Sequence, residues 1–193
     1  MKLAVVLLSL AAIAQVQPVP RHWAKGSSIR VWIDPDTMPP NGEALVEKAT
    51  ATWTTAAGGR FTLVKAWEST APVRVHFMPA DYRYGVTAPR VNRETGLLVK
   101  AEVYVAADAG RDPLERQIIV YLTALHELGH ALGMEHTNDI TSIMYLFRQP
   151  DDGEKFFGAY RRRLKAAVDI GSPAATGLSS DDVVTLRALY DLR

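Results

Sequence analysis

The chain has 193 residues, a formal net charge of +1 and no cysteine, and 48% of its residues are hydrophobic. This is the composition of an ordinary soluble domain with a packed core. The lack of cysteine excludes disulfides, thiolate zinc sites, iron–sulfur clusters and cysteine nucleophiles, and the near-neutral charge gives no global electrostatic reason to bind nucleic acid or a membrane.

The first residues have the pattern of a secretory signal peptide. Lys2 precedes an apolar run that ends in small residues at Ala14. The run is shorter than the ~20 residues of a membrane span, although a buried helix or an uncleaved anchor is the alternative. We expect a signal peptide over 1–14, a leader over 15–27 and one domain over 28–193, secreted or, in a Gram-negative bacterium, periplasmic.

Apolar periodicity predicts the first elements of this domain. Residues 29–33 alternate apolar and polar side chains, which is typical of a half-buried strand. Residues 41–57 have apolar side chains at helical spacing and end at Gly58, so we predict an amphipathic helix. Two further strands are predicted over 61–67 and 73–77.

The region after these strands is less regular. Residues 92–96 favour a turn, and the apolar-rich segment 97–106 predicts a strand, so we expect a loop or hairpin that leads into a strand. In the strand before it, His76 shares a face with Arg74, opposite Val75. We therefore interpret His76 as a surface histidine and not as a metal ligand.

A long helix has clear signals at both ends. Asp112 is placed as its N-cap, Pro113 as its first residue, and Glu115 stands three residues beyond the cap. The helix should run to about Leu132, because Gly133 is placed to terminate it.

This helix contains the start of the string H-E-x-x-H-x-x-G-x-x-H. Residues four apart lie on one helix face, so His126 and His130 present two imidazoles to one ion. Glu127 is rotated by about 100° from His126, which makes it a poor ligand but a suitable general base.

The third histidine requires the helix to end. If the helix continued, His136 would lie on the far side from His130. Gly133 can instead adopt the left-handed conformation that turns the chain back. Three imidazoles and a water then form a catalytic zinc site. The alternative, an ordinary helix with core histidines, requires a chance match on the order of one in ten thousand.

The extended string, followed by Met144 eight residues after His136, resembles the signature of the metzincin proteases. Thr137, the spacing to Met144 and the segment 178–190 resemble the matrixin branch. The resemblance implies an α+β fold: a twisted mixed sheet, mostly parallel, with two long helices and a small C-terminal lobe that ends in a helix. It also implies a methionine floor under the zinc.

The last helix has signals of its own. Ser179 and Asp182 form a start similar to a capping box, and an apolar stripe follows. The family resemblance implies that Asp181 or Asp182 bonds backbone near Met144, whereas a simple N-terminal charge on the helix is the alternative.

The chain also departs from the family pattern. Leu146 follows Tyr145, so the zinc-reaching tyrosine of some metzincins is missing. We expect no second zinc, and a structural Ca²⁺ stays open but disfavoured, because few acids and no histidine lie between Phe77 and Val105. Residues 148–177 predict a short amphipathic helix with an exposed basic run, which either shapes substrate access or packs over the last helix.

Together these patterns predict a secreted, monomeric zinc endopeptidase that cleaves protein or peptide substrates. His126, His130 and His136 would hold one Zn²⁺, and Glu127 would be the general base. The alternatives are a secreted zinc-binding module without turnover and a hydrolase of a non-peptide amide. We expect no nucleic-acid partner. We also expect no membrane span once the signal peptide has been removed.

Overall fold

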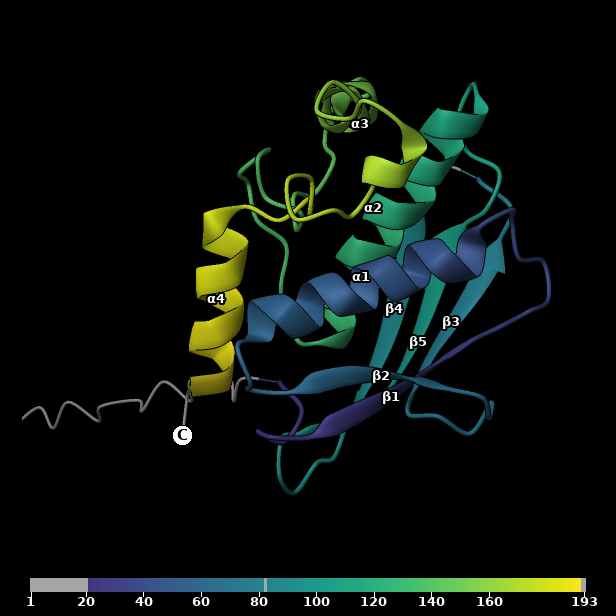
Figure 1. The fold of residues 1–193 in the computed structure, drawn as a ribbon. Helices are drawn as coiled ribbons and strands as arrows, with labels where there is room; N and C mark the ends of the chain where they lie inside the picture. The colour runs from purple at the N-terminus through teal and green to yellow at the C-terminus, as the bar shows by residue number, and fades with distance from the viewer. Residues whose placement is uncertain (1–20, 82, 192–193) are drawn as a thin grey trace, which may run out of the picture.

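A computed structural model describes residues 21–81 and 83–191 (Figure 1). The predicted signal peptide and residues 15–20 of the predicted leader lie outside the described residues. The strands are β1 (Ser28–Ile33), β2 (Thr62–Ala66), β3 (Val73–Met78), β4 (Gly85–Val91) and β5 (Leu98–Ala106). The helices are α1 (Gly42–Ala57), α2 (Pro113–Ala131), α3 (Asp152–Arg161), the short 3₁₀ helix η1 (Ala167–Asp169) and α4 (Ser180–Asp191).

The five strands form one mixed sheet in the order β2-β1-β3-β5-β4. All neighbouring pairs are parallel except β4, which pairs antiparallel with β5. This confirms the predicted mostly parallel sheet. It also shows that the region before residue 97 is a hairpin, in which β4 forms an edge of the sheet.

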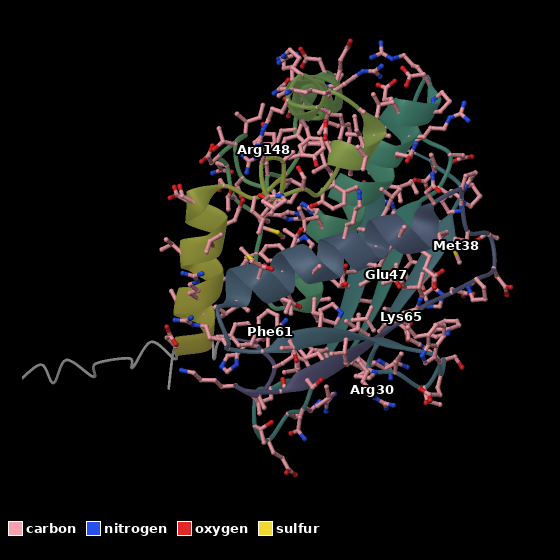
Figure 2. All side chains as sticks on the ribbon, in the orientation of Figure 1. Arg30, Met38, Glu47, Phe61, Lys65 and Arg148 are labelled. Atoms are coloured by element: carbon pink, nitrogen blue, oxygen red, sulfur yellow. The ribbon has the colours of Figure 1, made fainter. Side chains whose placement is uncertain are left out.

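The core lies between one face of the sheet and the helices α1 and α2 (Figure 1). Alternate strand residues such as Val31, Val75 and Val103 are almost fully buried on this face. Lys65 on β2 forms ion pairs with Glu43 and Glu47 on α1, which join this helix to the sheet. Figure 2 labels Lys65 and Glu47.

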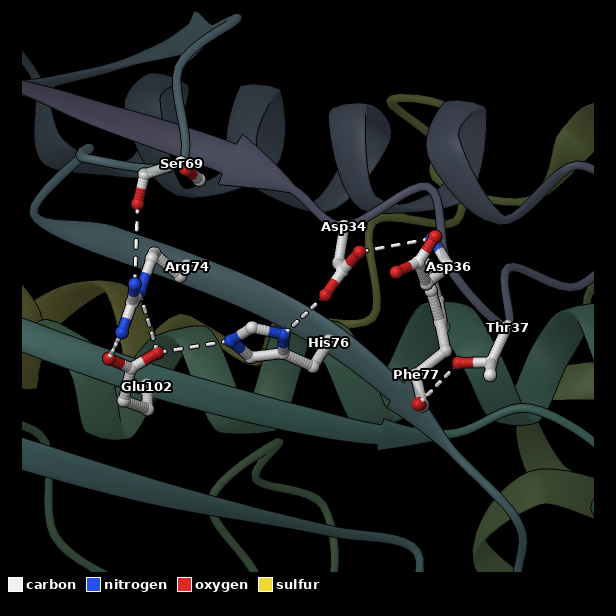
Figure 3. Close-up of polar contacts among 8 residues, drawn as sticks. All are labelled: Asp34, Asp36, Thr37, Ser69, Arg74, His76, Phe77 and Glu102. Atoms are coloured by element: carbon white, nitrogen blue, oxygen red, sulfur yellow. Dashed lines mark hydrogen bonds and ion pairs between the residues drawn. The ribbon is translucent and has the colours of Figure 1, made fainter.

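His76 lies on the opposite sheet face, as predicted, but it is half-buried and has two carboxylate partners (Figure 3). Its Nδ1 lies 2.8 Å from Asp34 and its Nε2 lies 3.0 Å from Glu102. Arg74 also donates to Glu102. The histidine therefore links the end of β1 to β3 and β5. Both of its ring nitrogens are occupied by carboxylates, so neither is free to bind a metal ion.

The segment between the methionine turn and α4 is only partly as predicted. α3 buries Phe157 and Tyr160, and the basic run that begins at its last residue is exposed. The apolar face of this helix does not extend to Val168, which is 77% exposed on η1. The carboxylate of Asp169 accepts the backbone N–H of Lys165 and of Ala166, which makes this stretch a separate capped turn.

Candidate metal centre and cleft

The long helix α2 begins where the sequence predicts. Asp112 accepts the backbone N–H of Leu114 and of Glu115 at 3.0 and 2.9 Å. The Glu115 carboxylate accepts the N–H of Arg111, one residue before the cap, so the cap is not the reciprocal box that the spacing suggests.

The helix ends in a Schellman motif, which turns the chain after His130. The N–H of Gly133 donates to the His130 carbonyl, and the N–H of Met134 donates to the Gly129 carbonyl. Gly133 has a φ of 99°. A Cβ atom there would lie 1.8 Å from the carbonyl oxygen of Arg21, so both the conformation and the space require glycine.

This turn brings the three predicted histidines together. The Nε2 atom of His130 lies 3.1 Å from that of His126 and 3.0 Å from that of His136. Within the described ranges, these residues are the only set of at least three His, Cys, Asp or Glu side chains whose ligand atoms converge closely enough for one ion.

The outer nitrogens of two rings set their tautomers. His126 donates from Nδ1 to the Ile143 carbonyl at 2.6 Å, and His130 donates from Nδ1 to the Met134 carbonyl at 2.8 Å. Each facing Nε2 of a neutral ring then carries a lone pair. Lone pairs about 3 Å apart repel each other unless a cation lies between them, so this donor set fits a zinc ion.

Burial keeps these imidazoles neutral. Desolvation, with the neighbouring His130, lowers the pKa of His126 to about 4. Desolvation also lowers the pKa of His130 and of His136. At neutral pH all three rings are therefore available as ligands and not as imidazolium ions.

A buried carboxylate on α4 holds the backbone segment that orients the ring of His126. Asp182 is 2% exposed and accepts the N–H of Ile143 at 3.0 Å and the hydroxyl of Ser142 at 2.5 Å. The Ile143 carbonyl in turn accepts the His126 proton. Of the two candidates, Asp182 and not Asp181 bonds the backbone beside Met144, and it also forms the predicted capping interaction with Ser179.

Met144 lies beneath the histidines. Its side chain is fully buried and packs on Gly129, where an added Cβ atom would lie 2.5 Å from the methionine sulfur. Gly129 stands between the two histidines of α2. The methionine therefore supports the helix face that carries them, which agrees with the predicted apolar floor.

Glu127 is 5% exposed and is held by a residue that the sequence analysis missed. The hydroxyl of Thr87 on β4 lies 2.7 Å from Glu127 Oε2 and 2.9 Å from the Glu127 carbonyl oxygen. A Cβ atom on Gly85 would lie 2.6 Å from Oε1. Because β4 was not predicted as a strand, no sequence signal pointed to Thr87 or Gly85.

The environment of Glu127 suits proton transfer. Burial raises the pKa of its carboxyl to about 7, against the opposing effect of the Thr87 hydrogen bond. A carboxyl with a pKa near the working pH both accepts and releases a proton readily.

A cleft extends from the histidines along β4 to α3. One side is lined by β4 residues such as Thr87, and the other by residues after the methionine turn, including Tyr145 and Phe147. Phe156 and Phe157 line it from α3. The first part of the segment 148–177, up to Phe157, thus borders the cleft. The helix α3 packs on α2.

Comparison with known families matches residues 30–157 to the matrixins. This match covers well over half of the chain and includes the entire helix with the first two histidines. The chain belongs to the matrixin family. Membership supports a zinc metalloendopeptidase at the level of the family, and it confirms the predicted fold.

Relatives of this matrixin chain include two kinds of vertebrate metalloproteinase. Over 117 residues it is 28% identical to the interstitial collagenase of Sus scrofa, a match that covers 58% of this chain and 24% of that protein. Over 37 residues it is 54% identical to matrix metalloproteinase-16 of Homo sapiens, which covers 19% of this chain and 6% of that protein. The matches span about a quarter of the relatives' length or less.

Among residues 21–81 and 83–191, no helix combines the length and the apolar character that crossing a bilayer requires.

Tyr145 is not the zinc-reaching tyrosine of other metzincins, according to the sequence pattern. Its hydroxyl donates to Asp152 on α3 at 3.0 Å.

Proposed function

We propose that this domain is an endopeptidase in which His126, His130 and His136 hold one Zn²⁺ and Glu127 is the general base. The observation that carries the proposal is the convergence of three histidine Nε2 atoms beside a buried carboxylate. Two of the rings are already oriented through carbonyls, which is the support that metal-binding imidazoles require.

When bound, zinc would polarise the scissile carbonyl and make the attacking water more acidic. Glu127 takes the proton of that water and delivers it to the leaving amine. Thr87 fixes one carboxylate oxygen of Glu127, so the group that moves the proton keeps its orientation. Because this carboxylate is buried, its pKa lies near 7, so at neutral pH it can take up and release a proton instead of staying ionised.

The substrate would bind as an extended chain along β4. This strand ends the sheet order, and its outer edge borders the cleft. A peptide that adds to the edge forms main-chain hydrogen bonds at alternate residues and directs side chains into the cleft. Pro89 is compatible with an edge position, where one missing N–H costs little.

The signal-peptide pattern at residues 1–14 supports export of the domain to the extracellular space or the periplasm. We propose that the mature domain acts there as a monomer on protein or peptide substrates. Sequencing the N-terminus of the protein recovered from culture medium or periplasm tests the export step. An intact Met1 there would contradict cleavage.

Zinc content and proteolysis of the purified chain together test the proposed activity. We expect about one zinc per chain, by analogy with other three-histidine sites, and cleavage of an unfolded protein that chelation abolishes. One zinc without cleavage would favour the binding module. Hydrolysis of small non-peptide amides alone would favour the second alternative.

A further inference from the structure

The sheet face opposite α1 and α2 carries a row of basic side chains. Arg90 on β4 pairs directly with Lys100 on β5, so the two side chains lie on the same face. Lys100 forms an ion pair with Glu102, two residues further along β5, and Glu102 pairs with Arg74 on β3. This is the outer face, because Ala101, between Lys100 and Glu102, is fully buried on the core side.

Arg30 on β1 continues the row into the interior of the sheet. Its chain neighbours Ile29 and Val31 are buried in the core, so the exposed Arg30 points to the outer face. Adjacent strands lie about 4.8 Å apart, so the basic residues from β4 to β1 span about 14 Å. We give the name basic patch to four residues: Arg30, Arg74, Arg90 and Lys100.

Three members of the basic patch surround a hollow. Arg30, Arg74 and Lys100 line a cavity of about 590 Å³ together with Ser69 and Thr70. The guanidinium of Arg74 is held in the wall, because it donates to the Ser69 carbonyl at 3.3 Å (Figure 3). Arginine, lysine, serine and threonine side chains all supply hydrogen-bond donors, so the hollow suits an anionic oxygen as its ligand.

The carboxylates of this face do not neutralise the basic patch. Glu102 pairs with two of its members and is only 16% exposed at its side chain. Glu68 lies 3.7 Å from Arg30, which is beyond hydrogen-bond distance. Among residues 21–81 and 83–191, no ion pair joins Arg90 to a carboxylate. The patch therefore keeps an excess of positive charge at the surface.

Protection of the sheet edge explains only part of this arrangement. A charged residue on an edge strand, such as Arg90 on β4, discourages pairing with other chains. Arg30 lies on β1, which is an interior strand with no edge to protect. The direct pairing of Arg90 with Lys100 also places like charges opposite each other, which costs stability. A negatively charged partner would offset this cost.

We propose that the basic patch binds an acidic segment of a protein substrate, outside the catalytic cleft. The inference rests on the proposed endopeptidase function and names a feature of its substrates. Pro89, the neighbour of Arg90, lines the cleft, so a polypeptide that extends along β4 past Pro89 reaches the patch without a break. Its carboxylates pair with Arg90 and Lys100 and with the donors around the hollow. This continuity with the cleft favours a polypeptide over a polysaccharide.

Fluorescence anisotropy with a labelled oligoglutamate peptide tests the binding, and an oligoglutamine peptide of equal length is the uncharged control. The test variant combines Arg30→Glu with Arg90→Glu and leaves Arg74 and Lys100, which pair with Glu102, in place. The control variant carries the same change of net charge at the exposed basic run after α3. It combines Arg162→Glu with Lys165→Glu. The single substitutions Arg30→Ala and Arg90→Ala replace the test variant if it does not fold.

We expect the wild type to bind oligoglutamate and not oligoglutamine, and the test variant to bind oligoglutamate about tenfold more weakly at low salt. Each single alanine substitution should weaken binding by a smaller factor, and the control variant by less than about twofold. Absent binding, or equal weakening in the test and control variants, would overturn the inference, since equal weakening reflects net charge alone. Binding of a heparin fragment but not of oligoglutamate would overturn it in favour of a sulfated polysaccharide.

Cleavage assays separate this inference from the proposed function. If the wild-type chain cleaves no peptide, the proposed function fails. Oligoglutamate binding that is lost in the test variant then still supports recognition of an acidic segment, and its absence overturns that recognition. If the chain cleaves peptides, a glutamate extension at one end of the peptide should lower KM relative to a glutamine extension, and the test variant should remove the difference. Equal KM values for both extensions at both ends would overturn the role in substrate binding.

Discussion

Asp182 and Ile143 lie 39 residues apart in the chain and are joined by a 3.0 Å hydrogen bond from the Ile143 N–H to the Asp182 carboxylate. The same peptide segment accepts the proton of His126 through its carbonyl. One buried carboxylate on the last helix therefore sets the position of a histidine on the longest helix. Substitutions far from the three histidines should consequently alter the metal centre.

Asp182→Ala tests this connection. The substitution leaves the Ile143 N–H and the Ser142 hydroxyl without their acceptor, so we expect a loss of about 3 kcal/mol in the free energy of unfolding and weaker zinc binding. Urea unfolding and zinc titration measure the two effects. Asp181→Ala, at an exposed neighbouring position, should change both little, and equal effects of the two variants would contradict the assignment.

Glu127→Gln tests the general base. The amide has nearly the shape of the carboxylate and cannot accept the water proton, so kcat should fall by about 10²–10⁴-fold while one zinc is retained. Peptide cleavage and elemental analysis on the same preparation measure both quantities. Turnover equal to that of the wild type would refute Glu127 as the base.

Thr87→Val tests how the base is oriented. Valine keeps the size of the side chain but removes the hydroxyl that lies 2.7 Å from Glu127 Oε2. We expect kcat to fall by about tenfold with little change in KM, because the hydroxyl orients a catalytic group. Thr87→Ser should retain most of the wild-type rate. A change in KM alone would instead place Thr87 in substrate binding.

Gly133→Ala tests the turn that delivers His136. Both the φ of 99° and the approach of the Arg21 carbonyl oppose a side chain, so unfolding should become easier by about 2–4 kcal/mol, with reduced zinc content. Gly59→Ala is the control, because Gly59 has a φ of 86° but no atom near the added Cβ. It should cost about 1 kcal/mol. Equal costs would show that the contact with Arg21 is unimportant.

The lowered pKa of Glu102 predicts that acid destabilises the sheet. Burial opposes its ionisation, but hydrogen bonds from Arg74, His76 and Lys100 outweigh burial and lower its pKa from 4.5 to about 2. Because the folded pKa is the lower one, the ionised group stabilises the fold above pH 4.5, and this contribution is lost as the pH falls towards 2.

The stabilisation from Glu102 is about 3 kcal/mol at neutral pH, of which about 2 kcal/mol is lost by pH 3. Urea unfolding at pH 6 and pH 3 measures this loss. Glu102→Gln should reduce the difference in stability between the two pH values, whereas Glu94→Gln, at an exposed turn position, should not. An identical pH dependence in the Glu102 variant would contradict the network.

Local patterns in the sequence were sufficient for the long helix and the histidine set. The cap at Asp112, the helical spacing of His126 and His130 and the terminating glycine depend only on residues within a few positions of one another, where helix geometry dictates which side chains share a face. The match of Met144 to the family pattern is local in the same sense. Strand periodicity predicted most of the sheet for the same reason.

Contacts between distant segments were decided only by the tertiary structure. Thr87 reaches Glu127 because β4 pairs antiparallel with β5 at the sheet edge, and an irregular strand with proline has no periodic signal. The choice of Asp182 over Asp181 depends on which way the first turn of α4 faces the Ile143 peptide. The bond from Tyr145 to Asp152 likewise depends on where α3 docks, since hydrogen bonds between remote residues follow from packing and not from spacing.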